Sequence, residues 1–288
     1  MMAVRPQAND DDAPVVVRRL GPARAGQGRR TLLIHGLGAN ASVYDPCAGL
    51  LADGLELWTA QLPWRGEGVG DWGRGPALGH WLERALRLVP GGAEVVVAHS
   101  MSANVLLDLL DQESRRGADP FTRFGVRALV LVSPFYRGAA EDFDWQTISY
   151  YLNDFHLIME EGIRVHSGGR LDADIQSAMA HRVRDRVGPY GWLRFFDLYL
   201  GTPGLQTGRI TVPSLVIGGE HDFAAPPGEG EALAAALPDA RVRILPTGHF
   251  PMIERPEEFA AEIRQFIDST LADDPQHGAG PRTLLEHH

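Results

Sequence analysis

The sequence contains no lysine, so all 27 of its basic residues are arginines. Without a lysine amine the chain has no group for a Schiff base, for covalent pyridoxal phosphate or for a phosphate-binding loop of the GxxxxGK[ST] type. Cysteine is also scarce. The single residue, Cys47, excludes an internal disulfide and any zinc site made of several thiolates. Because the histidines show no HExxH spacing either, we expect no metal site and no cofactor.

Long apolar runs are missing too. No stretch approaches the roughly 18 apolar residues that a membrane-spanning helix needs, and the N-terminus has no apolar signal-peptide core. These features predict a cytoplasmic protein with no membrane span. Basic residues are also fewer than acidic ones: 27 against 37, which gives a net charge of −10. Nucleic acid is therefore an unlikely partner. We expect a small-molecule partner, and the sequence leaves monomer and homodimer open.

Short β-branched runs alternate with amphipathic helical patterns along most of the 288 residues, of which 44% are hydrophobic. Several runs, such as Leu32–Ile34 and Val95–Val97, are continuously apolar, as expected of strands that are buried on both faces of a parallel sheet. This alternation predicts an α/β fold with a mostly parallel central sheet flanked by helices. The predicted strands are Val15–Arg18, Thr31–Ile34, Leu57–Ala60, Glu94–Ala98, Ala128–Val132, Ser214–Ile217 and Val242–Leu245.

One long interval interrupts this alternation. Residues 138–209 show only helical patterns, with turn signals at Gly168-Gly169 and Gly188-Pro189, and the interval is too long and too apolar for a loop. Residues 135–199 also hold 12 of the 23 aromatic residues of the chain. We interpret this interval as an inserted helical cap. The predicted division is a core of 15–137 and 210–272, a cap of 138–209, and flexible tails of 1–14 and 273–288, with 285–288 as a tag remnant.

The strongest chemical signal is Ser100, within Ala98-His99-Ser100-Met101-Ser102. It lies between the Val95–Val97 run and an apolar helical pattern, so a sharp strand–turn–helix would expose its hydroxyl above the sheet. Such a turn needs small residues two positions before and after the serine, and Ala98 and Ser102 are small. The alternative interpretation is a serine that only caps the helix.

A second signal is His35-Gly36-Leu37-Gly38, which follows another predicted strand. Glycines there allow a sharp backbone turn. The N–H groups of Leu37 and Met101 are candidates for an oxyanion hole, where each donor is worth roughly 3–4 kcal/mol.

Two further strands end in residues that suit a serine nucleophile. Asp222 follows one strand and His249 follows the last one, and ligand sites of open α/β sheets lie at these carboxyl ends. A serine hydroxyl needs a base, and the base needs a carboxylate to orient it. The order Ser100, Asp222, His249 supplies nucleophile, acid and base. Glu220 is the rival candidate for the acid.

The four motifs together resemble those of the α/β-hydrolase fold superfamily, over roughly residues 15–271. The resemblance implies that Ser100 is the nucleophile, Asp222 the acid and His249 the base, with Leu37 and Met101 forming the oxyanion hole. It also places the helical interval where the family carries its cap.

The sequence departs from the family pattern at two points. The strand–turn–helix around Ser100, called the elbow below, has Ala98 and Ser102 where the family usually has glycines. Gln61 stands where the family usually has Asp. The serine nucleophile argues against the dehalogenases and epoxide hydrolases of the superfamily, which use an Asp.

The resemblance implies a serine hydrolase that cleaves an ester, thioester or lactone, and the aromatic cap favours an apolar or aromatic substrate. The same triad also serves C–C bond hydrolysis, acyl transfer or cyclisation. A different class of function is a non-catalytic ligand-binding protein on this fold. The residues expected to line the substrate pocket are His35, Gly36, Trp64, His99, Phe135, Trp145, Tyr151 and Phe250.

Overall fold

The computed structural model of the chain describes residues 14–21, 28–66 and 72–271. Within them, seven strands form one sheet in the order β1-β3-β2-β4-β5-β6-β7, in which all neighbours are parallel except β1 with β3. The predicted α/β fold with a mostly parallel sheet is therefore confirmed. The strands are β1 (Val16–Arg19), β2 (Arg29–Ile34), β3 (Leu55–Gln61), β4 (Val95–His99), β5 (Ala128–Val132), β6 (Ser214–Gly219) and β7 (Ala240–Leu245).

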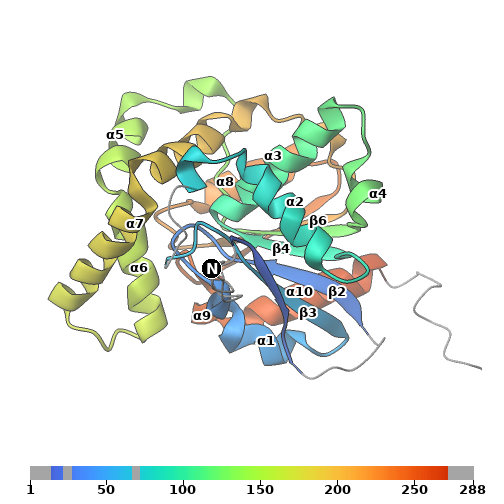
Figure 1. The fold of residues 1–288 in the computed structure, drawn as a ribbon, viewed down its shortest axis with the longest axis horizontal. Helices are drawn as coiled ribbons and strands as arrows, with labels where there is room; N and C mark the ends of the chain where they lie inside the picture. The colour runs from blue at the N-terminus through green and yellow to red at the C-terminus, as the bar shows by residue number, and fades with distance from the viewer. Residues whose placement is uncertain (1–13, 22–27, 67–71, 272–288) are drawn as a thin grey trace, which may run out of the picture.

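Helices cover both faces of this sheet (Figure 1). The helices are α1 (Asp45–Leu51), α2 (Leu78–Leu88), α3 (Met101–Arg115), α4 (Pro120–Phe124), α5 (Trp145–Asn153), α6 (Phe155–Ser167), α7 (Ala173–Leu200), α8 (Pro227–Ala236), α9 (Pro251–Glu254) and α10 (Pro256–Leu271). Short 3-10 helices lie at Ala41–Tyr44, Trp72–Arg74, Ala140–Asp142, Thr202–Gly204 and Thr207–Arg209.

The alternation of side chains along each strand separates the core into two layers. Leu32 and Ile34 of β2 belong to a buried cluster that includes residues of α2, α3 and α8. Leu33 belongs to a second cluster, on the other face, that includes residues of α1, α9 and α10. All three side chains are fully buried. Because successive strand residues point to opposite faces, a run that is apolar throughout is what a sheet covered on both sides requires.

The segment between β5 and β6 is helical and contains α5, α6 and α7, which lie together at one side of the molecule in Figure 1. The predicted turns are present. Gly168 ends α6 in the left-handed conformation, and α7 is kinked at Gly188, whose φ is 65°. The role of this segment as a cap stays a prediction, and the predicted tails lie outside the described residues apart from Pro14. Among the described helices, none is long and apolar enough to cross a membrane.

Candidate active site

Ser100 occupies the tight turn between β4 and α3. Its backbone has φ 56° and ψ −131°, a conformation that few residues other than glycine adopt. Its N–H donates to the carbonyl oxygen of Val132, at the end of the neighbouring strand β5, at 2.8 Å. A strained backbone conformation persists only where the surrounding structure holds it, and such residues are common at functional sites. Here it lifts the Ser100 hydroxyl from the carboxyl edge of the sheet.

The side chains of Ser100, His249 and Asp222 form one continuous hydrogen-bonded chain. The Ser100 hydroxyl lies 3.0 Å from Nε2 of His249, and Nδ1 of His249 lies 2.8 Å from Oδ2 of Asp222. A carboxylate can only accept a hydrogen bond, so Nδ1 of His249 carries the proton and donates to Asp222. In the neutral ring Nε2 is then unprotonated and accepts from the Ser100 hydroxyl. All three residues are buried. The three strand-end residues of the sequence pattern therefore meet at hydrogen-bond distance.

The carboxylate of Asp222 is fixed by the loop that carries it. Its Oδ1 accepts from the N–H groups of Ala224 and Ala225, each at 2.9 Å, which leaves Oδ2 for His249. Glu220, the rival acid, is exposed, and its N–H donates to the carbonyl of Leu245 in β7. The geometry therefore favours Asp222 as the residue that orients His249.

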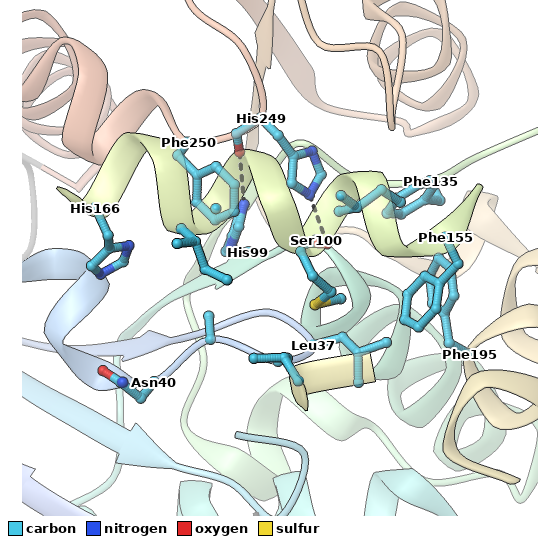
Figure 2. A pocket seen from close by; sticks show the side chains of 17 residues that line it. Leu37, Asn40, His99, Ser100, Phe135, Phe155, His166, Phe195, His249 and Phe250 are labelled. Atoms are coloured by element: carbon cyan, nitrogen blue, oxygen red, sulfur yellow. Dashed lines mark hydrogen bonds between the residues drawn. The ribbon is translucent and has the colours of Figure 1, made fainter. Parts of the chain in front are cut away.

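The loop that carries His249 is held from two sides. Glu254 accepts from the N–H groups of the residues flanking His249, namely Gly248 at 3.0 Å and Phe250 at 3.2 Å. On the other side, Nε2 of His99 donates to the His249 carbonyl oxygen at 2.9 Å (Figure 2). Burial keeps the pKa of His99 well below its ordinary value, so this ring is neutral. His99 therefore supports the position of His249 rather than exchanging protons.

The two residues predicted to supply the oxyanion hole, Leu37 and Met101, lie beside Ser100. Met101 is the first residue of α3, and N–H groups in the first turn of a helix have no partner within it. Leu37 lines the same cavity as Ser100. The next residue, Gly38, is anchored by its N–H to the carbonyl of Trp64 at 2.8 Å, which fixes the path of the loop that carries Leu37.

An apolar cavity of about 810 Å³, counting the part open to solvent, surrounds Ser100 and His249. Figure 2 shows Ser100 near the middle of its lining, below the helix that forms the rear wall. Among the residues that the structure describes, the lining contains no Asp, Glu or Arg side chain. It consists of Leu37, Gly38, Ala39, Asn40, His99, Ser100, Phe135, Phe155, Ile158, Met159, Gly162, Ile163, His166, Val183, Phe195, His249 and Phe250.

Of the residues predicted for the pocket wall, His99, Phe135 and Phe250 are in this lining. Five others are not, within the part of the chain that the structure describes, and their positions need correction. Trp145 is 82% exposed on α5 because its helix turns that face outward. Tyr151, on the same helix, is buried and donates its hydroxyl to the carbonyl of Ala224.

The other three lie behind the wall. Trp64 is fully buried and donates to the Ser102 hydroxyl at 3.1 Å. His35 accepts from the N–H of Leu62 at 3.0 Å, and burial lowers its pKa to about 4. Gly36 lies directly beneath the elbow, where a Cβ atom would be 2.9 Å from that of Ser100. These residues shape the loops around the cavity without facing it.

The sequence interpretation named none of the wall residues that α6 supplies. The lining residues of this helix are Phe155, Ile158, Met159, Gly162, Ile163 and His166. Their spacing of i, i+3, i+4, i+7, i+8 and i+11 is that of one helix face. The signal was therefore present in the sequence as periodicity. What periodicity does not give is the direction in which the face points.

Within the described residues, no group of three or more His, Cys, Asp or Glu side chains is arranged to hold a metal ion.

Comparison with known proteins places this geometry in a family. A model of the alpha/beta hydrolase family matches residues 31–262, which cover most of the chain and all the residues of the candidate site. The chain belongs to the alpha/beta hydrolase family.

Individual relatives of this alpha/beta hydrolase are esterases and a lactonase. A pimeloyl-[acyl-carrier protein] methyl ester esterase from Aromatoleum aromaticum is 26% identical over 82% of this chain and 97% of its own. A thermophilic esterase from Thermogutta terrifontis matches with a TM-score of 0.59 and 20% identity, over 89% of this chain and 93% of that one. An enol-lactonase from Burkholderia xenovorans LB400 matches with a TM-score of 0.57 and 20% identity, over 88% and 96%. These two structural matches show the fold alone.

Proposed function

We propose that this alpha/beta hydrolase is a serine hydrolase that cleaves a carboxylic ester, thioester or lactone with an apolar acyl group. The observation that carries the proposal is the hydrogen-bonded chain of Ser100, His249 and Asp222 at the wall of an apolar cavity. Its order and geometry are those by which a histidine base activates a serine hydroxyl. The esterase and lactonase activities of the relatives agree with this reaction class.

The acylation step follows from the placement of these groups. The Ser100 oxygen attacks the substrate carbonyl carbon while its proton passes to Nε2 of His249, and Asp222 stabilises the resulting imidazolium. The negative charge that develops on the carbonyl oxygen is stabilised by the N–H groups of Leu37 and Met101. When the tetrahedral intermediate collapses, His249 returns the proton to the leaving alcohol or thiol. The acyl group remains on Ser100 as an ester.

Deacylation repeats the step with water. His249, neutral again, takes a proton from a water molecule that attacks the acyl carbon, and the same N–H groups stabilise the second oxyanion. Collapse breaks the bond to the Ser100 oxygen, which regains its proton from His249. The products are a carboxylic acid and free enzyme.

The cavity lining sets the class of acyl group. Ten of its side chains are Leu, Ala, Phe, Ile, Met or Val, and a charged acyl chain would be buried there without a partner at a large energetic cost. The substrate is therefore a neutral, apolar acyl compound rather than a dicarboxylate or an amino acid ester.

The test combines covalent labelling with turnover. We expect a fluorophosphonate probe to add once to the folded protein, on Ser100, and p-nitrophenyl butyrate to be hydrolysed with multiple turnovers. Ser100→Ala should lose both properties. Ser42→Ala is the matched control because Ser42 is exposed in a 3-10 helix and is not among the lining residues of the cavity, so it should keep both.

Three results would contradict the proposal. A probe adduct that persists in Ser100→Ala would place the nucleophile elsewhere. Stoichiometric binding of acyl esters without turnover by the folded wild-type protein would instead indicate a ligand-binding protein. Transfer of the acyl group to an added alcohol in preference to water would identify an acyltransferase that uses the same residues.

A further inference from the structure

The cavity beside Ser100 has two unlike ends. At one end lie Asn40, which is half-buried, and His166, which is exposed, so this end is the polar mouth. At the other end lie the buried rings of Phe135, Phe155 and Phe195. Figure 2 shows Asn40 and His166 on one side of Ser100. The three rings of the other end, Phe135, Phe155 and Phe195, lie on the opposite side. A substrate bound across Ser100 therefore sends one part to the mouth and the other to the aromatic end.

Phe155 is the wall that closes the aromatic end. It also lines a second cavity on the outer side of α6 and α7, so its side chain separates the two spaces. The other residues of this outer cavity are Leu152, Asn153, His156, Arg184, Asp185, Gly188, Pro189 and Trp192. Phe155 is buried, and it is the one described residue that the linings of both cavities share.

The position of the Phe155 ring is set by Trp192. The two rings stack with centroids 3.9 Å apart and planes at 29°. The kink of α7 at Gly188 lies one turn before Trp192, and the following Pro189 cannot donate a helical hydrogen bond. The kink diverts α7 at the level of Phe155, and the residues of the kink line the outer cavity. The wall at this end is therefore the stacked pair of Phe155 and Trp192, with the Phe155 ring on the side of Ser100 and the outer cavity beyond.

The order of product release assigns the two ends. The alcohol leaves while the acyl group is still bonded to Ser100, so the leaving group needs the open mouth and the acyl group suits the closed end. Resting on the proposed function, we propose that Phe155 is the specificity-determining residue that limits the length of the acyl chain. A chain that reaches the Phe155 ring fills the aromatic end, and each further methylene must displace that ring from Trp192.

The experiment changes the wall in both directions. Phe155→Ala removes the inner ring of the wall and deepens the aromatic end, and we expect it to move the preferred acyl length upward on p-nitrophenyl esters from acetate to palmitate. The ratio of kcat/KM for long to short chains should rise roughly tenfold or more, since a few methylenes in an apolar pocket change specificity by that amount. Phe155→Trp thickens the wall and should shift the preference toward shorter chains.

Two controls separate wall effects from general damage. Trp145→Ala removes an exposed ring outside both cavities and should leave the acyl profile unchanged. A series of acetate esters with lengthening alcohols tests the other end, and Phe155→Ala should leave that profile unchanged too.

The outcomes are distinct. If the wild-type protein hydrolyses acyl esters but neither Phe155 variant moves the acyl profile, or if the alcohol profile moves instead, the assignment of Phe155 is overturned. If the wild-type protein hydrolyses no acyl ester, the proposed function itself fails and the assignment fails with it.

Discussion

The hydroxyl of Tyr151 donates a hydrogen bond to the carbonyl oxygen of Ala224 at 2.7 Å. The N–H of Ala225, which belongs to the same peptide unit as that carbonyl, donates to Oδ1 of Asp222 at 2.9 Å. A residue of α5, in the helical segment between β5 and β6, is thus connected through one peptide unit to the carboxylate that orients His249. Tyr151 is 3% exposed and its ring packs edge-on against Phe135 and Tyr199, so its hydroxyl is held in place.

Tyr151→Phe removes this hydrogen bond and keeps the ring. The loss of one buried hydrogen bond is worth about 1 kcal/mol, and we expect part of it to appear as poorer orientation of Asp222. The expected result is a fall in kcat of several-fold with KM little changed, measured on a p-nitrophenyl ester. Tyr190→Phe is the control because Tyr190 is 55% exposed. A lower melting temperature with unchanged kcat would show that Tyr151 serves stability alone.

The two acidic candidates of the sequence can be separated by paired substitutions. Asp222→Asn keeps the size of the side chain but changes the tautomer that His249 adopts, so kcat should fall by roughly 10³-fold or more. Glu220→Gln changes an exposed side chain and should leave kcat within about twofold of wild type. Steady-state kinetics of the two purified variants decide this. Equal effects of the two substitutions would remove the basis for assigning the acid to Asp222.

The strands and the residues that follow them were predictable because they depend on local pattern. Runs such as Val95–Val97 must be buried on both faces, and parallel strands bring their carboxyl ends to one edge. Ser100, Asp222 and His249 each follow such a strand, so their proximity could be expected. The start of α10 at Pro256 is likewise a local feature, because Pro256 and the acidic residues after it favour a helix start.

The cavity wall was not predictable to the same degree, because composition does not give direction. The aromatic content of the helical segment suggested Trp145 and Tyr151 as wall residues. One faces solvent and the other supports the Asp222 loop. Which face of α6 points toward Ser100 depends on how α6 packs on α7, and that packing involves residues far apart in the sequence. Phe155 and Ile158 became visible as wall residues only in three dimensions.

Gly36 shows how tightly the elbow is packed, and its replacement is a third prediction. A Cβ atom there would lie 2.9 Å from the Cβ of Ser100 and 3.0 Å from Nδ1 of His99. Gly36→Ala should therefore displace Ser100, lower kcat by roughly tenfold or more, and cost about 1–3 kcal/mol of stability through overpacking.

The control for this change is Gly49→Ala. Gly49 lies in α1, and a Cβ atom there would meet nothing within 4 Å. Alanine also has the higher helix propensity, so stability should stay equal or rise and kcat should not change. Wild-type kcat in Gly36→Ala would mean that the elbow tolerates a methyl group, contrary to the close approach seen here.

A buried carboxylate behind the site leads to the last prediction. Glu229 of α8 accepts from the Tyr199 hydroxyl and from the N–H of Tyr136 at 2.9 Å, and Nε of Arg137 lies 3.5 Å from its Oε1. Burial outweighs these partners and raises the pKa of Glu229 to about 7, from an ordinary value of 4.5. The folded protein therefore keeps a proton on Glu229 over a pH range in which the unfolded chain has released it.

The sign of the effect on stability follows from this difference. Between the unfolded and folded pKa values the folded state binds more protons, so the free energy of unfolding falls as pH rises through this window. The full loss is on the order of 3 kcal/mol.

Glu229→Gln is neutral at every pH, so its stability should not carry this loss. Urea unfolding of both proteins at about pH 5 and about pH 8 should show wild type losing stability relative to the variant. The exposed Glu231→Gln serves as control, and a pH-independent difference between wild type and Glu229→Gln would show that Glu229 is ionised throughout.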